Sequence, residues 1–243
     1  MRYKNYIFDL YGTLVDINTD EWSAQLWKKM AILYGYYGAS YTFKELGKAY
    51  GELVEQEKKA VRQRHPAYTV IDIKIEKVFR ALFTRKGVKP KKATVLEVCE
   101  VFRCFSTKYI KLYDGVTELL DTIKANGGCI YLLSNAQRTF TENELHMLGL
   151  TPYFDGICIS SDEECSKPDS HYFQILFDRY GLKKEESVMI GNDYLADIGG
   201  AADFGVDSVY IHQLISPEIK GELRSSFAVM DGDVHKITQY FFA

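Results

Sequence analysis

The feature that most constrains the fold is an alternation of short apolar segments with helical segments after residue 112. Strands are expected at 129–133, 156–160, 188–190 and 206–211, and helices at 116–126, 139–148, 170–180 and 194–204. Short apolar strands that alternate with helices form right-handed βαβ crossovers, with a parallel sheet covered on both faces. The sequence therefore predicts an α/β fold with a doubly wound parallel sheet.

Residues 6–8 give one more strand of this kind, but a long helical region separates it from the others. The region spans about residues 18–111 and predicts four helices. The apolar stripe of the first helix begins at Trp22, and the second follows the capping box of Thr42 and Glu45. The third begins near Asp72 and the fourth at Val95. The third helix is expected to end at Gly87, although 70–75 also fits a strand. We predict a core of residues 1–17 and 112–243, interrupted by a helical cap of residues 18–111.

Composition excludes several classes of protein. With 243 residues, 47% of them hydrophobic, the chain is long enough to bury a core without disulfides. Its net charge of -3 gives no sign of nucleic-acid binding. The five cysteines are scattered without a Cys-x-x-Cys pair, and Asp9 interrupts the first apolar run before a signal peptide is complete. We expect a cytoplasmic protein with a small-molecule substrate and no nucleic-acid or membrane partner. The oligomeric state stays open.

Polar residues follow the predicted strands. Asp9 comes after the first strand, with Gly12 and Thr13 close behind it. The other groups are Ser134-Asn135, Ser166-Lys167-Pro168-Asp169, and Gly191-Asn192-Asp193 with Asp197. Sites of doubly wound folds lie at the carboxyl ends of the strands, so we expect these groups to meet at one sheet edge.

This set of side chains suits phosphoryl transfer. A carboxylate can attack phosphorus, Mg²⁺ held by acidic oxygens neutralises charge, and Lys, Ser and Thr hold the nonbridging oxygens. Asp9 would be the nucleophile. Taken singly, each residue is also typical of a turn or a helix cap, so the argument depends on their joint occurrence.

The same motifs resemble those of the haloacid dehalogenase-like hydrolase superfamily. The matching pieces run from Phe8-Asp9-Leu10-Tyr11-Gly12-Thr13-Leu14 through Leu133-Ser134-Asn135 and Ser166-Lys167-Pro168 to Ile190-Gly191-Asn192-Asp193 with Asp197-Ile198. The resemblance implies a Rossmann-like core with an α-helical cap after the first motif. It also implies that Asp9 is the nucleophile and that Thr13, Ser134, Asn135 and Lys167 surround the transferred group.

Tyr11 departs from the pattern that the resemblance implies for phosphatases, in which this position is a second Asp that protonates the leaving group. A phenol, with a reference pKa of about 10, is a poor general acid at neutral pH. Tyr at this position resembles the dehalogenase branch. That branch also has an Arg early in the cap that accepts halide, whereas this chain has no Arg between Arg2 and Arg62. The arginines at 62, 64, 80 and 85 lie elsewhere in the sequence and cannot be assigned this halide-binding role.

Asn192 is the second departure, because the resemblance implies an Asp directly after the glycine. We expect Mg²⁺ to bind through Asp9, the Tyr11 carbonyl and Asp197, with Asp193 as a direct or water-mediated ligand. The acidic pair beside Asp9 favours phosphate chemistry over dehalogenation. The leading hypothesis is a Mg²⁺-dependent phosphatase with an aspartyl-phosphate intermediate, in which Asp9, Tyr11 and Lys167 serve catalysis. The alternatives are a 2-haloacid dehalogenase and a non-catalytic phosphate-binding homologue.

Overall fold

A six-stranded parallel sheet forms the core of the protein, which a computed structural model describes over residues 3–243. The order β5-β4-β1-β6-β7-β8 places β1 between β4 and β6. Their bounds are β1 (Asn5–Phe8), β4 (Cys129–Ser134), β5 (Gly156–Ile159), β6 (Ser187–Gly191), β7 (Asp207–Ile211) and β8 (Phe227–Val229). Strands β4 and β5 lie on one side of β1, and β6, β7 and β8 lie on the other. β1 therefore lies at the topological switch point of a Rossmann-like α/β core.

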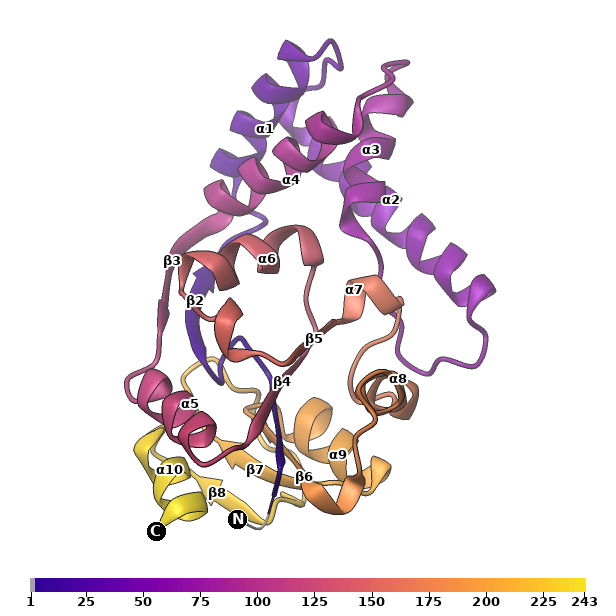
Figure 1. Cartoon of the computed structure of the whole chain (residues 1–243). Helices are drawn as coiled ribbons and strands as arrows, with labels where there is room; N and C mark the ends of the chain where they lie inside the picture. Colours follow the sequence, from indigo (N-terminus) through magenta and orange to yellow (C-terminus); the bar gives the residue numbers. More distant parts are fainter. Residues whose placement is uncertain (1–2) are drawn as a thin grey trace.

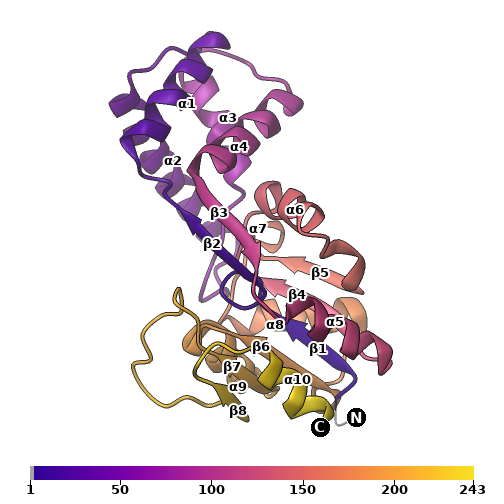
Figure 2. The same cartoon turned by 90° about the vertical axis from the view of Figure 1, so that its left-hand side faces the viewer.

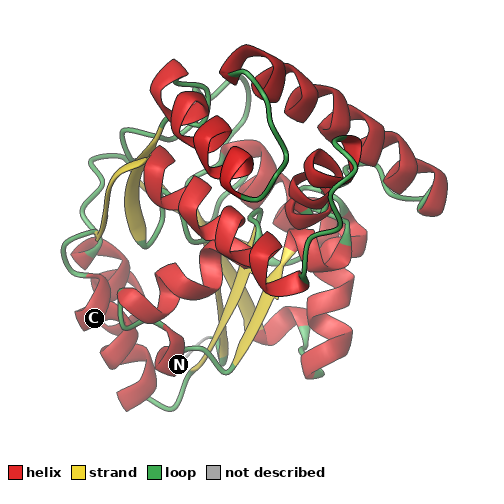
Figure 3. Ribbon diagram, turned by 90° about the horizontal axis from the view of Figure 1, so that it is seen from above, coloured by secondary structure: helices red, strands yellow, loops and turns green. Residues whose placement is uncertain are grey.

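Helices cover both faces of this sheet (Figure 3). Successive side chains of a strand point to opposite faces, so Tyr6 and Phe8 belong to one apolar cluster and Ile7 belongs to another. The first cluster packs against α5 (Val116–Ala125) and α10 (His235–Phe242), and the second packs against α8 (Ser170–Tyr180) and α9 (Gly200–Phe204). The remaining core helices are α6 (Arg138–Met147), α7 (Ser160–Glu163), and the short turns η1 (Thr151–Tyr153) and η2 (Lys184–Glu186).

Four helices stand above the sheet with an apolar cluster of their own (Figure 1). They are α1 (Ala24–Tyr36), α2 (Phe43–Arg64), α3 (Ile75–Arg85) and α4 (Lys92–Ser106). Ser23 caps α1, and Thr42 with Glu45 forms the predicted capping box of α2. Phe140 of α6 joins this cluster from the core.

The predicted helical region was wrong at both of its ends. Strands β2 (Val15–Thr19) and β3 (Thr107–Leu112) pair antiparallel there and connect the four helices to the core (Figure 2). Periodicity within each segment did not reveal this pairing, because the partners are far apart in sequence. The boundaries of core and cap at residues 17/18 and 111/112 therefore pass through this ribbon, and the division into two domains stays a prediction.

Other elements also differ from expectation. The helix expected at 194–204 is a π-helix, η3 (Tyr194–Gly199), followed by α9. The third cap helix begins at Ile75 rather than Asp72, and 70–75 is not a strand, although Ile71 forms an isolated bridge with Cys165. Strand β8 and helices α7 and α10 were not anticipated. Within residues 3–243, no helix is both long and apolar enough to cross a bilayer.

Candidate active site

The predicted site residues meet at the carboxyl edge of the sheet, because β1, β4 and β6 are parallel neighbours. Asp9 follows β1, and its backbone N–H donates a 2.9 Å hydrogen bond to the carbonyl of Ile190 on β6. The chain then turns at Gly12, whose φ is +87°. A Cβ at Gly12 would lie 2.3 Å from Nδ2 of Asn192, so only glycine allows the first and last motifs to approach so closely.

Lys167 is the centre of the site. Its ammonium donates to Oδ1 of Asp9 at 2.7 Å and to Oδ1 of Asp197 at 2.6 Å. Lys167 and Asp197 are almost fully buried, and Asp9 is 8% exposed. Burial alone would lower the pKa of Lys167, but the attraction of both carboxylates outweighs it and raises that pKa. The ammonium therefore stays charged in the site.

The pKa of Asp197 is raised in this site. Burial raises its pKa to about 7; Lys167 opposes this rise, and the nearby Asp9 adds to it. Its second oxygen accepts from the backbone N–H of Asp193 at 2.9 Å. Gly191 makes room for this carboxylate, because a Cβ there would lie 2.3 Å from Oδ2 of Asp197. Two buried carboxylates thus share one ammonium.

Asn135, Thr13 and Ser134 surround this group. The Asn135 side chain binds the backbone of Lys167 at both ends, accepting from its N–H at 2.8 Å and donating to its carbonyl at 3.0 Å. The Thr13 hydroxyl lies 3.4 Å from Oδ2 of Asp9 and 3.3 Å from Oδ1 of Asn192. Ser134 is buried at the end of β4, where its carbonyl accepts from the Tyr172 hydroxyl. Every predicted substrate-binding residue therefore lies at this edge.

Asp193 takes the role of a helix cap, which the sequence left open for it beside metal binding. Its carboxylate caps η3 and accepts from the backbone N–H groups of Leu195 and Ala196, both at 2.9 Å. It also lines the small cavity over Asp9, which has a volume of about 200 Å³. Asn192 occupies the neighbouring position, where it contacts Thr13 and Ser216. The role of Asp193 as a metal ligand stays a prediction.

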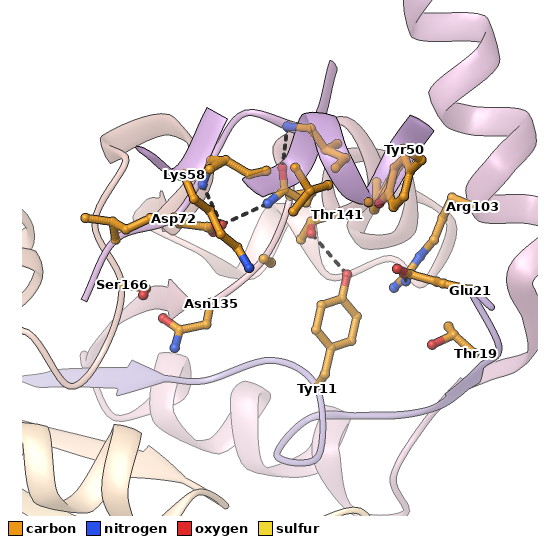
Figure 4. A pocket seen from close by; sticks show the side chains of 18 of the residues that line it. Tyr11, Thr19, Glu21, Tyr50, Lys58, Asp72, Arg103, Asn135, Thr141 and Ser166 are labelled. Carbon is orange, nitrogen blue, oxygen red and sulfur yellow. Dashed lines mark hydrogen bonds and ion pairs between the residues drawn. The ribbon is translucent and has the colours of Figure 1, made fainter. Parts of the chain in front are cut away.

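Tyr11 turns its hydroxyl toward Thr141 of α6 (Figure 4). The hydroxyl lies 3.0 Å from Oγ1 of Thr141 and donates a short hydrogen bond to the carboxylate of Glu144. Burial and the negative charge of Glu144 raise the pKa of this phenol well above its ordinary value. The side chain at the position of the missing general acid is therefore an even weaker acid than a free phenol.

The residues that surround Tyr11 were not predicted from the sequence. Arg103 of α4 lies with its guanidinium carbon 5.5 Å from the centre of the Tyr11 ring, and its Nε donates to Glu144 at 2.6 Å. Glu21 lies 3.5 Å from the other side of the guanidinium (Figure 4). No local sequence pattern links these residues to Tyr11. The only signal for Arg103 is that a charged residue lies beside the apolar stripe of the fourth predicted helix.

The site has donors that suit a divalent cation. Asp9 and Asp197 leave one negative charge uncompensated by Lys167, and hard carboxylate oxygens are the ligands that Mg²⁺ prefers. Within residues 3–243, no group of three or more His, Cys, Asp or Glu side chains is arranged to hold a metal ion. The charge balance therefore fits a cation, although the third acid, Asp193, is engaged in capping.

Comparison with known proteins agrees with this fold and motif order. Residues 3–205 match the sequence model of the haloacid dehalogenase-like hydrolase family. The chain is 29% identical to the phosphoserine phosphatase of Thermus thermophilus over 143 residues, which cover 59% of this chain and 56% of that protein. It is 26% identical to (S)-2-haloacid dehalogenase 1 of a Pseudomonas species, with 87% of this chain and 86% of that protein covered.

Solved structures show the same fold. The HAD phosphatase from Thermococcus onnurineus aligns over 98% of both chains with a TM-score of 0.61 and 16% identity. The magnesium-bound HAD-hydrolase YfnB of Bacillus subtilis aligns over the full length of both chains with a TM-score of 0.58 and 20% identity. For several relatives, including the phosphoserine phosphatase, the chain spans only about half of the relative's length.

A match over most of the chain, together with the predicted motifs at one sheet edge, defines the class of protein. The chain belongs to the haloacid dehalogenase-like hydrolase family.

Proposed function

We propose that this hydrolase is a Mg²⁺-dependent phosphatase that acts on a small phosphate monoester through an aspartyl-phosphate at Asp9. The observation that supports this most is the Lys167 ammonium held between Asp9 and Asp197 beside a cavity of about 200 Å³. Fixed donors around a carboxylate stabilise charge that develops on a transferred phosphoryl group. The phosphatases among the relatives agree with this chemistry.

In this proposal, an Asp9 oxygen forms a bond to phosphorus and the bond to the leaving oxygen breaks. The leaving group departs with the electron pair and takes its proton from water. Water then attacks phosphorus, which returns the Asp9 carboxylate and releases inorganic phosphate. Lys167 and Thr13 hold the nonbridging oxygens, and Asn135 keeps Lys167 in place through its backbone. Asp9, the Tyr11 carbonyl, Asp197 and Asp193 would hold Mg²⁺, which would neutralise the charge of the substrate.

Asp9→Asn tests the covalent step. We expect this variant to fold and to lose at least about a thousandfold in kcat, because an amide cannot replace the attacking carboxylate. The measurement is release of inorganic phosphate from phenyl phosphate with Mg²⁺ present. Asp16→Asn is the matched control, since Asp16 lies on β2 and contacts Lys111 and Tyr109 rather than the site. A folded Asp9→Asn variant that keeps more than a few per cent of activity would rule out the mechanism.

Removal of the metal tests the proposed requirement for Mg²⁺. We expect excess chelator to abolish phosphate release and added Mg²⁺ to restore it, because a carboxylate and a phosphate dianion repel each other. Asp197→Asn should raise the Mg²⁺ concentration needed for half-maximal activity at least about tenfold, as a lost ligand does. Full activity in chelator contradicts the metal requirement and favours dehalogenation.

Dehalogenation is the second candidate, and Tyr11 is the observation that favours it. The Pseudomonas dehalogenase also aligns with most of the chain. Against it, the nearby Arg103 is paired with Glu144 and lies next to Glu21, so it is not free to accept halide. Halide release from a 2-haloacid without added metal, in the absence of phosphatase activity, would support the dehalogenase.

A further inference from the structure

Two cavities adjoin at the candidate active site. The small one contains Asp9 and Lys167, whereas a larger one of about 810 Å³ lies between the cap helices and the core. Tyr11 and Asn135 line both of them. A phosphate held beside Asp9 would therefore place its leaving group in the larger cavity, so the walls of that cavity select the leaving group.

Aromatic rings form part of these walls. Trp22 and Tyr50 come from the cap side, Phe140 and Tyr11 from the core side. The indole of Trp22 is 68% exposed and meets the Tyr50 ring edge to face, with centroids 5.9 Å apart. Within residues 3–243, the Tyr50 hydroxyl has no hydrogen-bond partner. The cavity thus offers ring faces and a free hydroxyl to a planar group.

The charges in the cavity are unbalanced. Its lining holds the acids Glu21, Glu55 and Asp72, but only two cations, Lys58 and Arg103. Both cations are engaged: Lys58 is 2.9 Å from Glu55, and Arg103 is held by Glu144 just behind the lining.

Asp72 has no ion pair in the described part of the chain. Its carboxylate accepts hydrogen bonds from Ser160, Gln137 and the backbone of Ile73. Burial raises the pKa of both Glu21 and Asp72, as expected for carboxylates without enough compensating charge. An anionic leaving group would find no unpaired cation among the described lining residues, and it would face these carboxylates.

We infer that the larger cavity takes a leaving group that carries an aromatic ring and no negative charge, so that the substrate is a neutral or cationic aryl-containing phosphate monoester. This inference rests on the proposed function and names its substrate class. The cavity would exclude phosphate esters of hydroxy acids and bisphosphates, because its acidic lining repels their second negative charge.

Three esters test the inference: phenyl phosphate, 3-carboxyphenyl phosphate and 3-(aminomethyl)phenyl phosphate. Substituents at this position change the acidity of the phenol little, so differences in rate report binding rather than leaving-group chemistry. We expect kcat/KM for the carboxylate ester to be at least about tenfold below that of phenyl phosphate, given the strength of charge pairs at a protein surface. The ammonium ester should equal or exceed phenyl phosphate. A carboxylate ester as good as phenyl phosphate would overturn the inference and leave the proposed function intact.

If none of the esters releases phosphate with Mg²⁺ present, the proposed function fails. Calorimetric affinities of the same three esters for the wild-type protein then still test the charge preference. Tighter or equal binding of the carboxylate ester would contradict it, whereas the same order of affinities as expected for kcat/KM would support it.

Substitutions of the lining acids test which residues cause the discrimination against the carboxylate ester. Glu21→Gln and Asp72→Asn should each reduce the discrimination against the carboxylate ester several-fold. Glu52→Gln is the matched control, because Glu52 lies on the same helix as Glu55 and pairs with Arg85 away from the cavity. Equal discrimination in all four proteins would remove the lining acids from the explanation.

Trp22→Ala tests the aromatic part. It should raise KM for phenyl phosphate about fivefold and leave KM for acetyl phosphate, which has no ring, unchanged, because ring contacts contribute about 1 kcal/mol. The exposed Trp22 can be removed without opening a buried core. An equal KM for phenyl phosphate in the wild type and the variant would show that the phenyl ring of the substrate does not pack against Trp22.

Discussion

At the residue scale, Tyr11 determines which leaving groups the proposed phosphatase would accept. Its hydroxyl is committed to Glu144 and Thr141, and Arg103 lies over its ring. Because this hydroxyl donates to Glu144 and its pKa is raised, Tyr11 is a poor donor of the proton that an alkoxide leaving group needs. We therefore expect the wild type to favour aryl and acyl phosphates, whose leaving groups are weak bases, over alkyl phosphates.

Tyr11→Asp should reverse part of this preference. General acid catalysis contributes about 10² to 10⁴ in rate, so alkyl phosphate turnover should rise at least about tenfold while aryl turnover changes little. The measurement is the ratio of kcat/KM for phenyl phosphate and for an alkyl phosphate.

Tyr11→Phe is the control, because it removes the hydroxyl without adding an acid, and its ratio should stay that of the wild type. Robust alkyl turnover in the wild type, with a ratio that Tyr11→Asp leaves unchanged, would mean that another residue supplies the proton. Dehalogenation by the wild type that Tyr11→Asp destroys would instead identify a dehalogenase.

At the scale of elements, the segment between α2 and α3 docks on the loop that carries Lys167. Asp169 accepts from the backbone N–H groups of Thr69 and Val70, and the Glu164 carbonyl accepts from Asp72. The Glu164 carboxylate binds Arg64 at 2.8 Å and Lys77 at 2.9 Å. The cap thus contacts the core at the loop that carries Lys167 as well as through the β2–β3 ribbon.

Glu164→Gln should weaken this attachment. Burial opposes the ionisation of Glu164, but hydrogen bonds from Arg64 and Lys77 outweigh it and lower its pKa to about 2. The folded-state pKa is thus below the unfolded value of about 4.3, so the stabilisation is present above that value and is lost as pH falls toward 2. We expect a loss of about 1 kcal/mol in the free energy of unfolding at pH 7, since both cations are partly exposed.

Urea unfolding between pH 7 and pH 2.5 measures this effect. The difference in stability between the wild type and Glu164→Gln should shrink as the pH falls. Glu186→Gln removes an exposed pair with Lys4 and serves as the control for a surface carboxylate. A difference that does not change with pH would show that ionised Glu164 does not stabilise the fold.

At the scale of the whole molecule, the protein has separate apolar clusters in the cap and on each face of the sheet. Phe102 lies at the centre of the cap cluster, where its ring contacts Trp27, Tyr50, Phe79 and Phe140. Because Phe140 belongs to α6, this cluster also joins the cap to the core.

Phe102→Ala should destabilise the cap by about 3 to 5 kcal/mol, the usual cost of a large cavity in a packed core. Amide hydrogen exchange should accelerate in α1–α4 and change little in β1, β4 and β6. Leu176→Ala, in the cluster between α8 and the sheet, should show the opposite distribution. Equal loss of protection in both regions would mean that cap and core unfold as one unit.

Local sequence patterns determined the α/β class, the family, the four cap helices, and the segments at or after the strand ends that carry Asp9, Ser134, Lys167 and Asp197. These predictions succeeded because strand length, helical periodicity and turn residues are properties of neighbouring residues, and parallel strands bring their carboxyl ends to one edge. The roles of the site residues stay predictions until they are measured.

Only the tertiary structure decided which distant groups meet. It paired β2 with β3, joined Asp9 and Asp197 through Lys167, and placed Arg103 and Glu144 on Tyr11. No sequence spacing encodes such contacts, because they depend on how the cap packs on the core and on which charge satisfies each buried group. That packing gives Tyr11 its partners and the larger cavity between cap and core its excess of acidic side chains.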